Sequence, residues 1–192
     1  MKRLVVTEWM TLDGIYDADT MPQWFAPYDS DERQAWIKDS VLSADAFLLG
    51  RVTYEMLMSY WPNVTDRKSK EIELADRLNS APKYVASTTM KVGGWNNSII
   101  LPKDNVVEEV RKLKQESGGN IVVTGSGTLV QSLVDSRLID EYRLLVHPIL
   151  AGSGKRPFKD GMSSAKMELV KSQELPLGVL GLVYQPTKSV DR

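Results

Sequence analysis

The sequence predicts an α/β fold whose central sheet is mostly parallel and gains antiparallel strands at its C-terminal edge. From residue 4 to about residue 134, short apolar runs typical of buried strands alternate with segments of helical periodicity, as in strands joined by crossover helices. From residue 142 onward, extended runs follow one another without helical segments between them, which favours antiparallel strands. No linker, repeat or low-complexity tract divides the chain, so we expect a single domain over residues 1–192.

The first strand is followed by a long loop and then by a helix. Residues 4–6 are apolar and begin the strand, and turn formers between positions 17 and 27 predict the loop. The loop carries Trp24 and Phe25, so it is either a lid over a ligand or a segment packed on the domain. We expect a helix from Ser30, because the two acidic residues after it suit a helix N-terminus.

The remaining elements follow from the same periodicities. We expect further strands at residues 46–49, 83–86, 99–101, 121–123, 142–149, 167–173 and 178–184. We expect further helices at residues 51–60 and 69–78, after Asp104, and after Gly127. Asp104 is placed to cap its helix, and the glycine pair at 118–119 ends that helix.

Composition argues against several classes of function. The chain has 24 Lys plus Arg and 25 Asp plus Glu, so no net field attracts nucleic acid or an anionic membrane surface. It has no cysteine and a single histidine, His147, so we expect no metal site and no disulfide. The apolar stretch near the N-terminus is short and broken by Glu8, so we expect a cytoplasmic protein without a signal peptide or a membrane span.

Two strand-to-helix junctions carry glycine at the end of a buried strand, at residues 50–53 and 125–128. At the carboxyl ends of strands in an open α/β sheet, helix N-terminal amides attract phosphate, and glycine lets the backbone approach it closely. One such glycine is explained equally well by a tight turn. Two in one small α/β chain predict a shared site for a diphosphate.

Neither junction matches the common nucleotide-binding loops. No Gly-Lys-Ser/Thr follows the spacer of a P-loop, and leucine and valine at 129–130 stand where a Rossmann loop approaches its third glycine. A further glycine-rich, basic stretch at 152–156 leads into Pro157 rather than into a helix, so we expect it to be a loop between edge strands.

Three motifs, taken with their order and spacing, resemble those of the dihydrofolate reductase superfamily. They are Thr-Leu-Asp-Gly at 11–14, Leu-Gly-Arg-Val-Thr-Tyr-Glu at 49–55, and Thr-Gly-Ser-Gly-Thr-Leu at 124–129. The segments 140–144 and 148–154 are similar to the closing section of the riboflavin-pathway reductase domain and of stand-alone proteins of that branch. The resemblance covers residues 2–184 and implies a three-layer fold, with helices on both faces of the sheet, and an NADPH-dependent reductase.

The resemblance also implies which residues bind the cofactor. Those at the NADPH diphosphate would be Gly50, Thr53, Gly125, Ser126, Gly127 and Thr128. Those around the adenosine 2′-phosphate would be Arg51, Ser87 and Thr88. An arginine pairs with phosphate through two parallel hydrogen bonds, and hydroxyl groups donate to phosphate as well.

The riboflavin-type branch keeps an aspartate near its substrate, which implies that Asp13 is the catalytic residue. We expect its pKa to be raised, so that it passes a proton near neutral pH; a simple Asp-Gly turn is the alternative. Folate is disfavoured as the substrate, because the helix from Ser30 lacks a distinctive match to the pteridine-binding carboxylate of folate enzymes. We expect His147, within an apolar strand, to be a hydrogen-bonded structural residue.

These expectations combine into one leading function and two rivals. We predict an oxidoreductase that transfers a hydride from NADPH to a small heterocyclic, pteridine-like or pyrimidine-like substrate, as dihydrofolate reductase and 5-amino-6-(5-phosphoribosylamino)uracil reductase do. The first rival is a non-catalytic nucleotide-binding protein of the same fold. The second is an interaction protein that dimerises through its edge strands. The resemblance implies a homodimer in any case.

Overall fold

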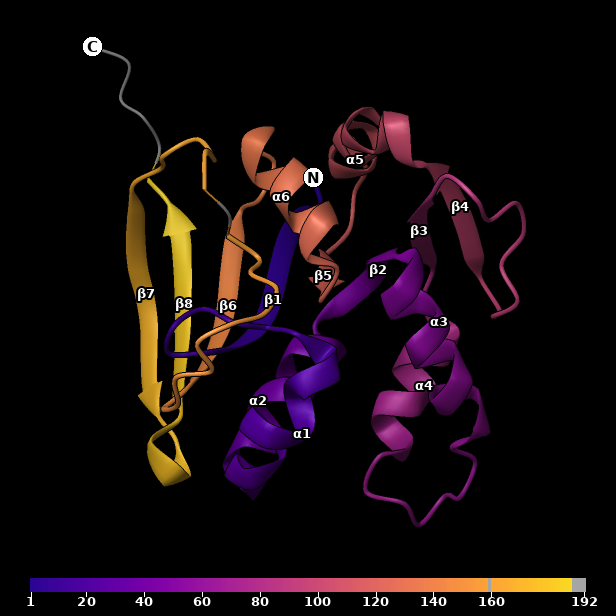
Figure 1. Ribbon diagram of the computed structural model, residues 1–192. Helices are drawn as coiled ribbons and strands as arrows, with labels where there is room; N and C mark the ends of the chain where they lie inside the picture. The colour runs from indigo at the N-terminus through magenta and orange to yellow at the C-terminus, as the bar shows by residue number, and fades with distance from the viewer. Residues whose placement is uncertain (159, 188–192) are drawn as a thin grey trace.

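The computed structural model describes residues 1–158 and 160–187, and the strands in this part of the chain form one mixed sheet (Figure 1). The strands are β1 (Arg3–Thr11), β2 (Ala44–Gly50), β3 (Lys83–Ser87), β4 (Ser98–Pro102), β5 (Asn120–Thr124), β6 (Glu141–His147), β7 (Met167–Glu174) and β8 (Leu180–Pro186). The helices are α1 (Met21–Trp24), α2 (Asp31–Leu42), α3 (Arg51–Tyr60), α4 (Ile72–Ser80), α5 (Val106–Gln115) and α6 (Gly127–Asp135).

The strand order is β4-β3-β2-β5-β1-β6-β8-β7. From β4 to β6 all neighbours are parallel, whereas β8 is antiparallel to both β6 and β7. The predicted parallel sheet with an antiparallel C-terminal edge is therefore confirmed. The sequence predicted that the antiparallel strands begin with the run at 142–149. That run is β6, which is still parallel to β1, because α6 crosses back along the sheet before it.

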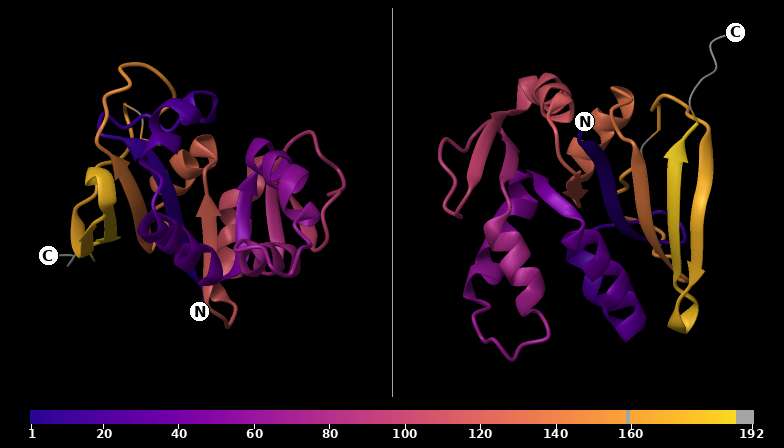
Figure 2. Two further views of the ribbon diagram at one scale, coloured as in Figure 1. Left: turned by 90° about the horizontal axis from the view of Figure 1, so that it is seen from below. Right: turned by 180° about the vertical axis from the view of Figure 1, so that it is seen from behind.

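Helices cover both faces of the sheet, which confirms the predicted three layers (Figure 2). On one face, α5 and α6 pack through residues such as Val110 and Leu133 against Leu4 of β1. On the other face, α4 packs through Leu78 against Phe47 of β2. Because all six parallel strands, β1 to β6, end at the same edge, the segments that follow them all lie there, as ligand sites of this architecture require.

The start of α5 differs from the prediction. Asp104 lies in a single 3₁₀ turn, and Asn105, the residue at the N-cap, makes no side-chain capping bond. The expectation that Asp104 caps this helix is therefore wrong. Helix α2 does begin as predicted, because the Ser30 hydroxyl accepts a hydrogen bond from the Arg33 N–H.

The long loop after β1 is folded into short helical turns and packs on the sheet. Trp24 is buried, and its ring lies edge-on to the ring of His147 at 5.4 Å between centroids. The Nδ1 atom of His147 lies 3.1 Å from the Met10 carbonyl oxygen, and burial lowers the pKa of His147 to about 4. The histidine is thus a buried, hydrogen-bonded neutral residue, as the sequence predicted.

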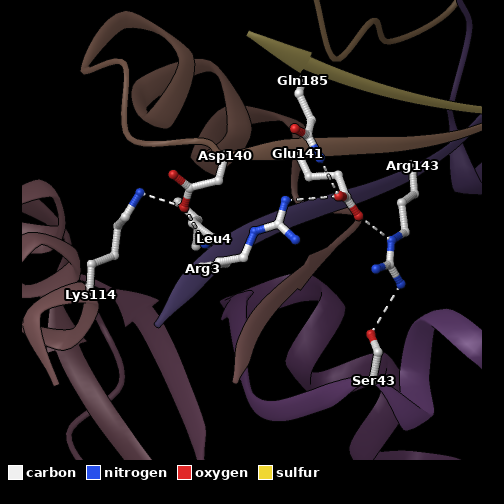
Figure 3. A network of polar contacts seen from close by, with 8 residues as sticks. All are labelled: Arg3, Leu4, Ser43, Lys114, Asp140, Glu141, Arg143 and Gln185. Carbon is white, nitrogen blue, oxygen red and sulfur yellow. Dashed lines mark hydrogen bonds and ion pairs between the residues drawn. The ribbon is translucent and has the colours of Figure 1, made fainter. Parts of the chain in front are cut away.

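At the opposite end of the parallel strands, where β1 and β6 begin, a polar network connects the strands (Figure 3). The Glu141 carboxylate accepts hydrogen bonds from Arg3, Arg143 and Gln185 at 2.7–3.0 Å. Burial acts to raise the pKa of Glu141, but the bonds from Arg143 and Gln185 outweigh it and lower the pKa. This glutamate shows how the fold satisfies a buried carboxylate that serves structure.

Within the described residues, no helix has the length and apolar character needed to cross a bilayer.

Candidate functional site

A cleft of about 480 Å³ opens at the carboxyl ends of the parallel strands. Every residue that the sequence predicted at the cofactor lines it except Gly125, which directly precedes the lining residue Ser126. The remaining lining residues include Tyr16, Asp17, Val106 and Lys155. The fold thus brings together three turns, after β2, β3 and β5, that are far apart in the sequence.

The two glycine turns are joined directly through Ser126. Its hydroxyl accepts a hydrogen bond from the Gly50 N–H at 2.8 Å and lies 2.8 Å from the Thr53 hydroxyl, to which it donates. A β-carbon at position 50 would lie 2.9 Å from the Ser126 Oγ, so only glycine permits this contact. The predicted sharing of one site by both turns therefore has a specific structural basis.

The turn before α6 is held in a left-handed conformation. Gly125 has φ +58° and Ser126 has φ +66°, values that a side chain with a β-carbon rarely adopts. A β-carbon at position 125 would also lie 3.3 Å from the Thr53 Oγ1. This double left-handed turn aims the first amides of α6 into the cleft.

The N-terminus of α6 offers donors to an anion. The N–H groups of Leu129 and Val130 both bond to the Ser126 carbonyl oxygen, and the Gly127 N–H donates to the Tyr16 hydroxyl at 3.1 Å. Within the described residues, the Thr128 N–H has no hydrogen-bond partner. Together with the positive end of the helix dipole, this amide suits a phosphate oxygen.

The residues predicted around the 2′-phosphate differ in how free their side chains are to contact a ligand. Arg51 is exposed and pairs with Glu55 one turn further along α3, at 2.8 Å, so the rest of its guanidinium remains available. Thr88 is exposed in the cleft. Ser87 is buried, and its Oγ accepts hydrogen bonds from the N–H groups of Thr89 and Met90. Ser87 therefore shapes the turn after β3, and Arg51 and Thr88 are the groups free to meet a ligand.

Asp13 does not line the cleft; its side chain connects the loop after β1 to the loop at 151–152. Its carboxylate accepts hydrogen bonds from the Thr11 hydroxyl at 2.5 Å and from the N–H groups of Ala151 and Gly152 at 3.1 and 2.7 Å. These bonds, that of Thr11 first, lower its pKa to about 2. The expected raised pKa is therefore wrong, because the Thr11 hydroxyl and two amides from a loop 138 and 139 residues away stabilise the ionised form. The catalytic role of Asp13 stays an untested prediction.

Tyr16 and Lys155 are among the cleft residues that reasoning from the sequence missed. Tyr16 is held in place by the loop that Asp13 ties, since its own N–H donates to the Lys155 carbonyl oxygen at 3.0 Å. A β-carbon at Gly127 would lie 2.1 Å from the Tyr16 hydroxyl oxygen, so the glycine makes room for the tyrosine. Lys155 pairs with Asp17 at 2.9 Å. The basic stretch at 152–156 was the one signal for it. This stretch is a loop, as predicted, but it follows β6, which is an interior strand and not the expected edge strand, and it also reaches the cleft.

An α/β domain with a cleft at the carboxyl ends of its parallel strands is the class of protein that this fold and site define. The model of the family described as "RibD C-terminal domain" matches residues 2–180. The chain is 30% identical over 183 residues to the uncharacterized protein YyaP of Bacillus subtilis (strain 168), covering 95% of this chain and 94% of YyaP. It is 36% identical over 161 residues to YwjB of the same organism, covering 83% and 84% of the two chains. The chain belongs to the RibD C-terminal domain family.

Solved structures agree with this fold. A putative riboflavin biosynthesis protein from Shewanella sp. PV-4 superposes with a TM-score of 0.67 at 20% identity, covering 97% of this chain and 99% of that one. A pyrimidine reductase-like protein from Corynebacterium diphtheriae gives a TM-score of 0.63 at 13% identity, covering 97% and 92%. At these identities the likeness establishes the shared fold.

Proposed function

We propose that this protein is an NADPH-dependent reductase of a small heterocyclic substrate. The observation that carries the proposal is the single cleft in which Ser126 joins the two glycine turns. The free Thr128 amide and the left-handed turn before it suit a diphosphate, and Arg51 with Thr88 suits a further phosphate nearby. Membership of a family of reductase-like domains supports the same conclusion.

In this proposal, the residues of the chain bind and orient the cofactor and the substrate. NADPH, when bound, supplies the hydride. The α6 amides and the Gly50 turn hold the diphosphate, and Arg51 selects for the 2′-phosphate. Asp13 orders the loop that carries Tyr16 by binding the amides of Ala151 and Gly152. A pteridine-like or pyrimidine-like ring beside the nicotinamide is the substrate class that we propose.

One observation favours a second candidate function. Asp13, the acid that the sequence predicted to be catalytic, is ionised and lies outside the cleft lining. A nucleotide-binding protein without turnover fits that placement. A panel of pteridines and pyrimidinones tested for NADPH oxidation separates the two candidates: oxidation above the rate without protein identifies a reductase, and NADPH binding without oxidation by any compound favours the second.

Replacing Arg51 with alanine is expected to weaken NADPH binding about tenfold or more, because a charge-assisted hydrogen bond to the 2′-phosphate contributes about 1.5–3 kcal/mol. NADH, which lacks this phosphate, is expected to bind the variant and the wild type alike. Quenching of tryptophan fluorescence on titration measures both affinities. Arg67→Ala is a matched control, since Arg67 is also exposed and ion-paired, at 2.6 Å from Asp76, but lies outside the cleft lining. Equal loss of both cofactors in Arg51→Ala would remove Arg51 from the 2′-phosphate.

We also propose that the protein forms a homodimer, which β7 supports. This strand is the last in the sheet and is exposed along its whole length, and Leu169 and Val170 are about half exposed. An edge strand with apolar side chains is a template for pairing with another chain. Light scattering is expected to give the mass of two chains for the wild type and of one for Leu169→Lys; a monomeric wild type would contradict the proposal.

A further inference from the structure

Glu8 of β1 is a buried acid without a partner. Its side chain is 2% exposed, and its Oε1 makes no hydrogen bond within the described residues. The fold treats Glu141, the other buried glutamate of the described chain, very differently, since three side chains donate to it. An unpaired buried carboxylate is costly. Its presence next to a ligand cleft is typical of a residue kept for function.

The strand register places Glu8 beside the turn that begins α6. Thr7 of β1 pairs with Thr124 of β5, so Glu8 is level with the next residue of that chain, Gly125. Side chains alternate along a strand, and Glu8 therefore shares its face with Val6, which packs in the core formed with α5 and α6. Glu8 thus lies beneath the cleft, on the side of α6.

Tyr16 lines the cleft and is within electrostatic range of Glu8. Its hydroxyl is bonded to the first amide of α6, that of Gly127. Burial, and next the charge of Glu8, raise the pKa of Tyr16. Two acids are therefore within electrostatic range of each other, one lining the cleft and one buried.

No charged group in the described part of the chain compensates Glu8. Among the elements around it, β6 contributes Tyr142 on the same face, and Lys155 and Asp17 lie beyond Tyr16, while the first turns of α6 carry no titratable side chain. Burial raises the pKa of Glu8 to about 8, so the carboxyl keeps its proton at neutral pH. Asp13 is the opposite case and is ionised. Pairs of acids whose environments separate their pKa values commonly divide the roles in acid–base chemistry.

We propose that Glu8 is the proton reservoir of the site, a positioning residue that returns a proton to Tyr16 after Tyr16 has donated one to the substrate. The inference rests on the proposed reductase function and assigns its proton source. It concerns a substrate that is reduced at a C=N or C=O carbon.

The step balances as follows. The carbon gains a hydride with its electron pair, and the π electrons move to the attached nitrogen or oxygen, which needs a proton. The O–H bond of Tyr16 breaks to supply it, and the O–H bond of Glu8 breaks to restore Tyr16 through a bridging water, as general acids do. Solvent then reprotonates Glu8.

The protonation state of Glu8 is tested first, by infrared spectroscopy of the full-length protein with and without NADPH. We expect a carbonyl band of a protonated carboxyl at pH 7 that is absent from Glu8→Gln and shifts when NADPH binds. Glu108→Gln, on the exposed surface of α5, is the matched control and is expected to keep the band. If wild type shows no such band at pH 7, the inference is overturned, whether or not NADPH binds.

Turnover provides the second test, with the fastest compound of the pteridine and pyrimidinone panel. Glu8→Gln and Tyr16→Phe are each expected to lower kcat by about 10²-fold and to leave the affinity for NADPH within about threefold. The double variant is expected to be no slower than either single one, since the residues act as a unit. Glu8→Asp, which keeps a carboxyl, is expected to restore part of the rate, and the decline of the wild-type rate above about pH 8 is expected to vanish in Glu8→Gln.

The outcomes distinguish failure of the inference about Glu8 from failure of the proposed reductase function. A wild type that does not bind NADPH overturns the proposed function, and the role of Glu8 falls with it. A wild type that binds and oxidises NADPH, with a Glu8→Gln variant of equal kcat and equal pH profile, overturns the inference alone. If no compound of the panel is reduced, the infrared band and its shift with NADPH decide the matter.

Discussion

Gly125→Val is expected to lower the affinity for NADPH by at least about 100-fold and to leave a folded protein. Gly125 has φ +58°, and a β-branched residue in that region is strained by about 1–3 kcal/mol. Its β-carbon would also lie 3.3 Å from the Thr53 Oγ1, where it closes the approach of a diphosphate to the turn. The strain lowers the stability of the fold, whereas the blocked approach lowers the affinity, and a 100-fold loss of affinity corresponds to about 2.7 kcal/mol in binding. Fluorescence titration measures the affinity, and circular dichroism reports the fold.

The matched control for this variant is Gly178→Val. Gly178 also has a positive φ, +76°, but lies in the turn between β7 and β8 with Pro148 as its nearest contact. It carries a similar backbone strain without touching the cleft, so NADPH affinity is expected to be unchanged. Unaltered affinity in a folded Gly125→Val protein would show that the turn before α6 does not bind the cofactor.

Glu8→Gln is expected to change how stability depends on pH. Burial raises the pKa of Glu8 from 4.5 to about 8, so the folded wild type binds more protons than the unfolded chain between these values. Its free energy of unfolding therefore falls as pH rises from about 4.5 to about 8 and is unaffected by this group above that. The shift corresponds to a loss on the order of 4–5 kcal/mol at most. The glutamine does not titrate and lacks this loss.

Urea unfolding of both proteins at pH 5 and pH 8 measures the effect. The stability of Glu8→Gln relative to wild type is expected to increase by a few kcal/mol between the two pH values. Glu108→Gln measures what the same substitution does on the exposed surface of α5. A constant difference between Glu8→Gln and wild type would mean that Glu8 is ionised in the fold at both pH values.

The order of elements could be predicted because each one carries its own periodicity. Residues 46–49 of β2 read as an unbroken apolar run because helices cover both faces of that strand, and α3 begins at Arg51 as expected. The cap of α5 was mispredicted, because a suitable residue type at position 104 does not fix the backbone that a cap needs. The parallel direction of β6 depends on how α6 crosses the sheet, which no local pattern specifies.

Some features of the candidate site could likewise be predicted from the sequence, and others could not. The glycine turns were predictable, since strand ends and helix starts are visible in the sequence and parallel strands end together. The low pKa of Asp13 could not be predicted, because two of its hydrogen-bond donors, the amides at 151–152, lie 138 and 139 residues away. In the sequence, Glu8 only interrupts an apolar stretch. Its burial arises in the folded sheet, where α6, from a distant part of the chain, packs on the face of β1 that Glu8 shares.

A crystal structure of the protein with NADPH bound tests the central claim most directly. The account predicts the diphosphate between the Gly50 turn and the Thr128 amide, with the 2′-phosphate beside Arg51 and Thr88. The Gly127 amide and Tyr16 are expected at the nicotinamide end of the cofactor. Crystals that hold NADPH elsewhere on the molecule, or that remain without it at a concentration far above the measured Kd, would contradict the account.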